Sequence, residues 1–220
     1  MTGSPLRGWT LAGLATALFG IPVIVTGQRL LLPGPMASAV VVAREIAILA
    51  LTAFLLWIVA SRERQSLSSI GFRADRIGRS LAWGFALAIV CFAAVLVCLA
   101  IYSVFGVHYG EGAAISRSLA VTLLALVRAG ISEEVFYRGY AIERLQSLTG
   151  SKWIAAAISL AAFAGFHFRQ GPAGVVLALV LGSIITGYYL WKRDLLAAMF
   201  AHFLVDFVPN VLLPAFGGDN

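Results

Sequence analysis

Two adjacent carboxylates, Glu133 and Glu134, lie inside an apolar run from Ser118 to Tyr140, whose other charges are Arg128 and Arg138. A carboxylate at the centre of a membrane helix costs about 2.5–3.5 kcal/mol on insertion scales, so intramembrane acids usually face a cavity and have partners. Two neighbouring carboxylates cost more, because like charges in one site disfavour joint ionisation. We therefore expect other polar groups of the chain to stabilise or use this pair.

Three pairs of residues four positions apart lie in three different apolar segments, so each pair shares one helix face. They are Glu134 and Arg138, Phe163 and His167, and His202 and Asp206. A glutamate beside a histidine in a partly dry pocket can activate water as a general base. A second histidine can stabilise the oxyanion of a tetrahedral intermediate. Together the pairs favour a hydrolase, although each alone is more typical of a structural ion pair, a helix–helix hydrogen bond or packing.

The turn at Gly150 relates the first two pairs. Glu133 lies seventeen residues before this glycine and His167 lies seventeen residues after it. In an antiparallel helix hairpin, equal arms put both side chains at the same depth, so we expect them to face each other. Arg128 lies five residues before Glu133, off its face on an α-helix, and its role stays open.

A metal site is the alternative chemistry for these residues. One glutamate and two histidines can ligate zinc, but the local HExxH signature is absent from the sequence. The sequence also lacks a Gly-rich phosphate loop and a GxSxG nucleophile motif. We expect no cofactor, with zinc as the alternative.

The composition indicates what positions these residues. Of the 220 residues, 60% are hydrophobic and 12% are charged, and the mean hydropathy is +0.93. Soluble domains are about 45–50% apolar and about 25% charged. The sequence therefore predicts an all-α, polytopic transmembrane bundle, with residues 1–220 forming a single integral-membrane domain.

We count about seven apolar segments that can span a membrane. Arg44 and Glu45, near the start of the second, are interpreted as a structural pair, and Gly150 is expected to cap the fourth. The segments are 8–26, 39–60, 81–105, 117–148, 152–168, 173–191 and 195–213.

The net charge of +6 does not indicate nucleic acid, because the basic residues lie mostly between apolar segments. Such basic flanks suit anionic lipid headgroups. The arginine-rich stretch 61–80 is expected to be cytoplasmic, which also places the N-terminus in the cytoplasm, and no cleavable signal peptide is evident. His108 and Glu111 are expected to be solvated loop residues.

The three pairs, with the continuation Tyr137-Arg138-Gly139-Tyr140, resemble the motifs of the CAAX prenyl-protease and bacteriocin-processing family (CPBP, or ABI). The resemblance covers about residues 117–213, the expected catalytic core. It implies an intramembrane glutamic endopeptidase of the bacterial inner membrane. Eukaryotic relatives remove the last three residues of prenylated proteins, and bacterial ones are linked to peptide maturation, bacteriocin immunity or signalling.

The resemblance also implies roles for the motif residues. Glu133 and His167 would activate water, and His202 with residue 206 would form the oxyanion site. Glu134 and Arg138 would support the pocket, and Phe163 belongs to the same motif as His167. The substrate would be a hydrophobic or lipidated peptide, selected within the membrane.

One position departs from the family's common form. The last motif residue is commonly Asn, but here it is Asp206. An ionised aspartate only accepts hydrogen bonds and would repel an oxyanion, so Asp206 is either protonated or orients His202. The departure keeps a second hypothesis open, in which a non-catalytic immunity or regulatory protein binds a peptide or partner in the same cavity.

Overall fold

The computed structural model describes residues 5–32, 34, 36–107, 109 and 118–216. Regular structure in these residues is helical throughout, without a strand. His108 and Glu111 lie outside the described residues.

Each predicted apolar segment is helical. The N-terminal part comprises α1 (Pro5–Leu31), α2 (Ser38–Trp57), the π-helical turn η1 (Ile58–Arg62), the 3-10 turns η2 (Leu67–Ile70) and η3 (Ala74–Arg76), and α3 (Ile77–Val104). A continuous rod follows, built from α4 (Leu119–Arg128), the π-helical η4 (Ala129–Ile142) and α5 (Glu143–Thr149). The remainder comprises α6 (Lys152–Phe166), the 3-10 turn η5 (His167–Gln170), α7 (Gly171–Lys192), α8 (Leu195–Phe207), the π-helical turn η6 (Val208–Leu212) and α9 (Leu213–Phe216).

The turns follow local sequence signals. Gly150 ends α5 in a left-handed conformation with φ of 71°, which confirms the predicted cap. Asp194 begins α8 by accepting a hydrogen bond from the Ala197 backbone N–H, and its other carboxylate oxygen accepts one from the Ser80 hydroxyl, 2.7 Å away. This carboxylate therefore joins the start of α8 to α3.

Five helices in the described residues are long and apolar enough to cross a membrane, which confirms an all-α membrane architecture but not seven spans. They are Arg7–Leu31, Ser38–Arg62, Ala74–Val104, Lys152–Lys192 and Leu195–Phe216. The range Lys152–Lys192 contains both α6 and α7, with the break at η5. The rod 119–149 is not among the five, and it carries the paired glutamates and several arginines.

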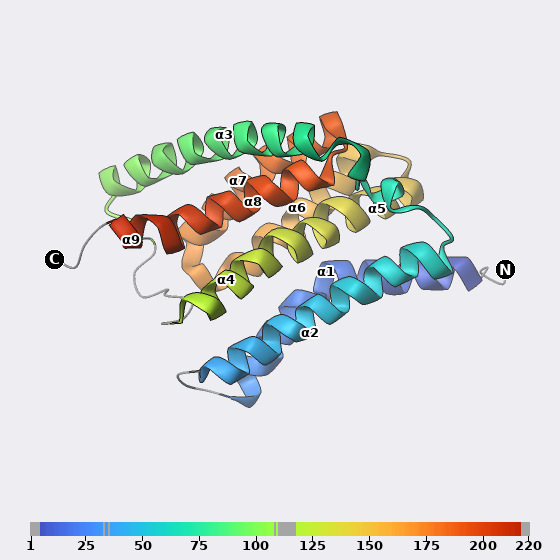
Figure 1. Ribbon diagram of the computed structural model, residues 1–220, viewed down its shortest axis with the longest axis horizontal. Coiled ribbons are helices and arrows are strands. Elements are labelled where there is room, and N and C mark those ends of the chain that lie inside the picture. The colour runs from blue at the N-terminus through green and yellow to red at the C-terminus, as the bar shows by residue number, and fades with distance from the viewer. Residues whose placement is uncertain (1–4, 33, 35, 108, 110–117, 217–220) are drawn as a thin grey trace.

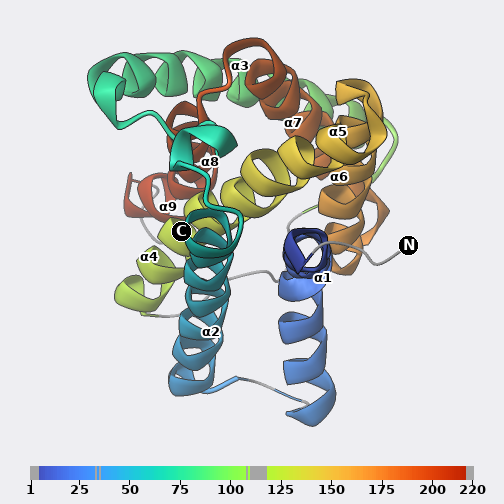
Figure 2. The same ribbon diagram turned by 90° about the vertical axis from the view of Figure 1, so that its right-hand side faces the viewer.

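The rod is the centre of the bundle. It contacts α8, α6, α1 and α2, while α3 packs along α8. Nearly every side chain of η4 is buried, including the aromatic rings of Phe136, Tyr137 and Tyr140. Figure 1 shows the helices running roughly along one axis, and Figure 2 shows the α1–α2 hairpin as a separate layer beside the rod.

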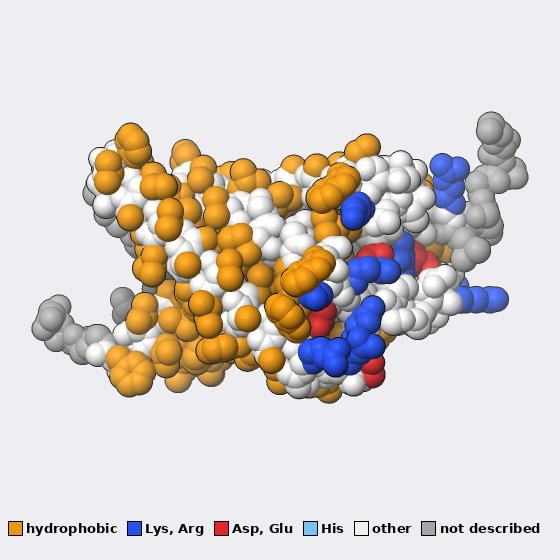
Figure 3. All heavy atoms as spheres, turned by 90° about the horizontal axis from the view of Figure 1, so that it is seen from above, with side chains coloured by type: hydrophobic (Ala, Val, Ile, Leu, Met, Phe, Trp, Pro, Cys, Tyr) orange, Lys and Arg blue, Asp and Glu red, His pale blue; other side chains and the backbone are white. Residues whose placement is uncertain are grey.

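The two ends of the bundle differ in charge. Figure 3 shows Lys and Arg side chains gathered at one end, while hydrophobic side chains cover most of the remaining surface of that face. All five tryptophans of the chain contact cations: Arg62 lies over Trp9 and Trp57, Lys192 over Trp83 and Trp191, and Lys152 over Trp153. Tryptophan and basic residues are both typical of a membrane interface.

Candidate functional site

The paired glutamates lie within η4, the π-helical part of the central rod. In π turns the backbone hydrogen bonds connect residue i with residue i+5, and such turns are frequent at functional sites. Residues five apart therefore face nearly the same side. Arg128 accordingly donates from Nη1 to Oε1 of Glu133 at 2.8 Å. This contact assigns Arg128 a partner that α-helical spacing does not predict.

Glu134 makes a second, separate set of contacts. Its Oε1 accepts a hydrogen bond from Arg138 Nη1 at 2.9 Å, as the four-residue spacing predicts. The same oxygen lies 2.7 Å from Nδ1 of His202 on α8. Arg138 also donates to the backbone oxygen of Gly182, at 3.3 Å, and to the Thr186 hydroxyl, at 3.4 Å. The carboxylate of Glu134 is completely buried, so these donors compensate for the lost hydration of Oε1, while Oε2 has no hydrogen-bond partner among the described residues.

A glycine allows η4 and α8 to approach closely enough for this contact. A Cβ atom at Gly130 would lie 3.0 Å from the backbone oxygen of Met199 and 3.1 Å from Cβ of Phe203. A larger residue at position 130 would push the two helices apart. The glycine thus helps to bring His202 within reach of Glu134.

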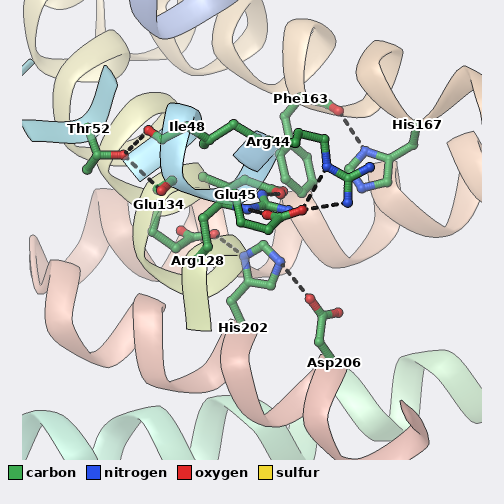
Figure 4. Close-up of polar contacts among 12 residues, drawn as sticks. Arg44, Glu45, Ile48, Thr52, Arg128, Glu134, Phe163, His167, His202 and Asp206 are labelled. Atoms are coloured by element: carbon green, nitrogen blue, oxygen red, sulfur yellow. Dashed lines mark hydrogen bonds and ion pairs between the residues drawn. The ribbon is translucent and has the colours of Figure 1, made fainter. Parts of the chain in front are cut away.

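His202 lies between two carboxylates. Its Nδ1 faces Glu134, and its Nε2 lies 3.5 Å from Oδ2 of Asp206, one turn further along α8 (Figure 4). The Asp206 side chain is 34% exposed, whereas that of His202 is 10% exposed. Asp206 therefore reaches the imidazole from the more open side of the site.

Phe163 forms an aromatic wall between the two histidines. Its ring centroid lies 4.9 Å from the ring of His167 and 6.2 Å from that of His202. The guanidinium of Arg138 lies 4.1 Å from the same centroid, and the ring of Tyr137 packs edge-on at 5.4 Å. Phe163 therefore packs, as its position predicts, against members of all three sequence pairs.

His167 is oriented by its own helix. Its Nδ1 lies 2.8 Å from the backbone oxygen of Phe163, which can only accept a hydrogen bond. The proton therefore lies on Nδ1, and Nε2 remains as the other functional nitrogen. Among the described residues, no hydrogen bond joins His167 to Glu133. The expectation that Glu133 and His167 lie at the same depth assumes an α-helical rise on both sides of Gly150. Instead, η4 is π-helical and His167 begins a 3-10 turn.

Glu45 of α2 belongs to the site and was not recognised as a functional residue from the sequence. Its carboxylate is fully buried, and it accepts hydrogen bonds from Arg44 and from Arg128 Nε, the latter at 2.5 Å. The Arg44–Glu45 pair is formed as interpreted, but it extends through Arg128 to Glu133. An acidic residue inside the second apolar segment was the signal that could have indicated this role.

An apolar cavity of about 460 Å³ is lined in part by η4 and α8, the elements that carry the glutamates and His202. Val135 and Phe203, which line it, directly follow Glu134 and His202 in the sequence. The complete lining is Leu56, Leu67, Ile70, Phe72, Leu81, Val127, Gly130, Ile131, Val135, Leu195, Leu196, Met199, Phe200 and Phe203. The cavity therefore offers almost no polar group to a ligand and suits a hydrocarbon chain.

Within the described part of the chain, no group of three His, Cys, Asp or Glu side chains is arranged to hold a metal ion.

Comparison with known proteins gives a family match for part of the chain. Residues 115–208 match the family model described as type II CAAX prenyl endopeptidase Rce1-like. This part of the chain is therefore similar to the CAAX-protease family. The match includes all three sequence pairs and confirms the resemblance drawn from them. The apolar helices indicate a multi-pass membrane protein. Searches of the curated proteins and of the solved structures give no match.

We expect Arg138→Met to destabilise this CAAX-protease relative strongly. The substitution leaves the Glu134 carboxylate buried without its cation, which typically costs about 3–5 kcal/mol. Thermal unfolding in detergent micelles measures the loss, and adding Glu134→Gln to the same chain should recover part of it. Tyr137→Phe is the matched control, because the buried Tyr137 hydroxyl has no hydrogen-bond partner among the described residues. An Arg138→Met protein that unfolds at the wild-type temperature would contradict the assigned ion pair.

Proposed function

We propose that the protein is an intramembrane endopeptidase that hydrolyses peptide bonds of a hydrophobic or lipidated peptide, using a water molecule activated by Glu133 and His167. One observation carries the proposal. The buried contacts of Glu134, Arg138 and Phe163 connect residues from all three motif pairs of a protease family. Glu133 directly precedes Glu134 in the sequence and pairs with a different cation, Arg128.

In the proposed reaction, Glu133 accepts a proton from water as the water oxygen attacks the scissile carbonyl carbon. His167, held through Nδ1, presents Nε2 to the same water and fixes its direction. The tetrahedral intermediate then collapses, the C–N bond breaks, and the proton on Glu133 passes to the leaving amine. No covalent bond to the enzyme is formed, which agrees with the lack of a GxSxG motif.

We assign His202 to stabilisation of the oxyanion and Asp206 to orientation of His202. The position of Asp206 opposite Nε2 supports orientation rather than donation to the oxyanion. An imidazole with a carboxylate at each nitrogen can hold two protons and present a positive charge to the intermediate. In this assignment Glu134 and Arg138 hold the ring in place.

The apolar cavity supports a substrate with a long hydrocarbon group. Most of its lining comes from α4, η4 and α8, which also carry Arg128, the glutamates and His202, so a chain bound there would lie beside the scissile bond. Burial of hydrocarbon contributes about 0.8 kcal/mol per CH₂ group. A lipidated or strongly hydrophobic peptide therefore gains most from this site.

We further propose seven spans in the bacterial inner membrane, with the N-terminus in the cytoplasm. The rod 119–149 and the separate helices α6 and α7 would then each cross the membrane. The basic and tryptophan-rich end of the bundle, which includes Arg62, Lys152 and Lys192, supports a cytoplasmic orientation for that end. Anionic headgroups are the matching lipid partner.

We expect Glu133→Gln to abolish cleavage while leaving the protein folded and inserted. The amide has the shape of the carboxylate but cannot accept the proton, and a positioned base contributes about 10²–10⁴-fold to rate. Mass spectrometry of membrane peptides and protein C-termini compares cells that produce wild type with cells that produce the variant. His167→Ala and His202→Ala should remove the same cleaved products.

A second candidate is a non-catalytic immunity or regulatory protein that binds a peptide in the same cavity, a reading that Asp206 favours. A binding protein should tolerate Glu133→Gln. Identical peptide sets in cells with wild type and with stably inserted Glu133→Gln would therefore favour this second function.

We propose a mechanism that needs no metal, and expect peptidase activity to survive thorough dialysis against a chelator. The measurement is the rate of peptide cleavage before dialysis, after dialysis and after addition of Zn²⁺. Loss of activity that Zn²⁺ restores would show that the zinc alternative is correct.

Filling the apolar cavity should reduce the preference for lipidated substrates. Ile131→Trp is expected to lower kcat/KM by about tenfold for a peptide with a farnesylated cysteine, because hydrocarbon contacts discriminate by about this amount. The same peptide without the lipid should be affected less. Ile158→Trp is the matched control, because Ile158 is 40% exposed and Ile131 39%, and Ile158 does not line the cavity. Equal losses for both peptides would refute a lipid-binding role.

A further inference from the structure

Helix α2 lies outside the segment that matches the protease family, yet it supplies a carboxylate to the site. Glu45 is 0% exposed, in a helix whose other buried residues are Val41, Ile48, Thr52 and Leu55. An ionised carboxylate in such surroundings is strongly unfavourable unless it is paired and hydrogen-bonded. The hydrogen-bond partners of Glu45 therefore explain how its buried carboxylate is stabilised.

The partners form a chain of alternating charges that ends at the proposed base. Arg44 donates from Nε and Nη2 to Oε1 of Glu45, at 2.8 and 2.5 Å. Arg128 donates from Nε to Oε2 of Glu45, at 2.5 Å, and from Nη1 to Oε1 of Glu133, at 2.8 Å. Figure 4 shows Arg44, Glu45 and Arg128 gathered beside the histidines. The chain thus connects α2, α4 and η4.

Because Arg128 binds both Glu45 and Glu133, it leaves one oxygen of Glu133 free of an arginine contact in the described part of the chain. A guanidinium free of other partners tends to bind a carboxylate in bidentate fashion, through two parallel hydrogen bonds. Because Glu45 accepts from Nε, Arg128 reaches Glu133 through Nη1 alone. Among the described residues, the Arg128 bond uses only Oε1 of Glu133, so Oε2 can accept a hydrogen bond from water.

We propose that Glu45 is a positioning residue for the Glu133 carboxylate and acts through Arg128. This inference rests on the proposed function, in which Glu133 accepts the proton of the attacking water. Glu45 does not touch the substrate. It holds the Arg128 guanidinium in the one orientation that keeps Glu133 paired through one oxygen and available through the other.

A purely structural role is the competing explanation, because the same contacts also tie α2 to the rod. A second hydrogen bond between α2 and the rod provides the control for a purely structural role. The Thr52 hydroxyl of α2 donates to the Ser132 hydroxyl of η4 at 2.8 Å, and both residues are buried. Thr52→Val removes this tie without touching Arg128 or Glu133. It should therefore affect stability but not turnover.

The test uses the full-length protein in lipid nanodiscs and a fluorescence-quenched peptide with a farnesylated cysteine three residues before its C-terminus. We expect Glu45→Gln to lower kcat by about 10–100-fold, the range that corresponds to one charged hydrogen bond of about 1.5–3 kcal/mol. KM should stay within about twofold, because Glu45 acts on the base and not on the bound peptide. Thr52→Val should leave kcat within about twofold.

A double-variant cycle separates positioning from structure. If Glu45 acts through Arg128, adding Glu45→Gln to Arg128→Met should lower kcat no further, since the effects of coupled residues are not additive. Additive losses in the double variant would overturn the proposal. So would equal losses for Glu45→Gln and Thr52→Val.

A second variant at position 45 and a comparison with Glu133→Gln complete the test. Glu45→Asp retains the charge on a shorter side chain and provides a folded variant if Glu45→Gln is produced poorly. It should also lose kcat without a change in KM, and wild-type turnover by folded Glu45→Asp would overturn the positioning role. Loss of cleavage in Glu133→Gln alone, with normal cleavage in both Glu45 variants, would overturn this inference and keep the proposed function. Equal rates for wild type and Glu133→Gln would overturn both.

Discussion

The structure depends on the neutralisation of two adjacent carboxylates inside an apolar bundle. Neighbouring residues on a helix point in different directions, so Glu133 and Glu134 cannot share one partner. Glu133 pairs with Arg128 on the side of α2, and Glu134 pairs with Arg138 and His202 on the side of α8. The need for two separate sets of partners explains why helices pack against the rod from both sides.

The π-helical turns make this arrangement compatible with one continuous rod. Arg128 precedes Glu133 by five residues, and Arg138 follows Glu134 by four, and both ion pairs form. In regular α-helical turns the five-residue pair would be splayed apart by the 3.6-residue period. The wider turns thus allow one helix to supply a cation to each of its two acids. Gly130 then lets α8 approach close enough for His202 to complete the second set.

The polar groups of the bundle fall into two regions with different physical roles. The first is the basic end, where every tryptophan contacts a lysine or arginine, as suits a lipid headgroup region. The second is the buried site, where charges are balanced by short contacts within the protein. The charged side chains of the second region are mostly buried, so their ion pairs are weakly screened and a change in one partner alters the energy of the others.

The sequence alone determined the helical membrane class, the apolar segments, the cap at Gly150 and the three pairs that resemble the protease motifs. These features are local, because hydropathy and four-residue spacing depend only on neighbouring positions. The tertiary structure decided the partner of Arg128, the inclusion of Glu45, the place of Asp206 opposite His202 and the apolar cavity. The sequence could not show these, because Glu45 and Arg128 are 83 positions apart and meet only when α2 packs on the rod. The π turns of the rod also became visible only in the structure, because hydropathy carries no signal for them.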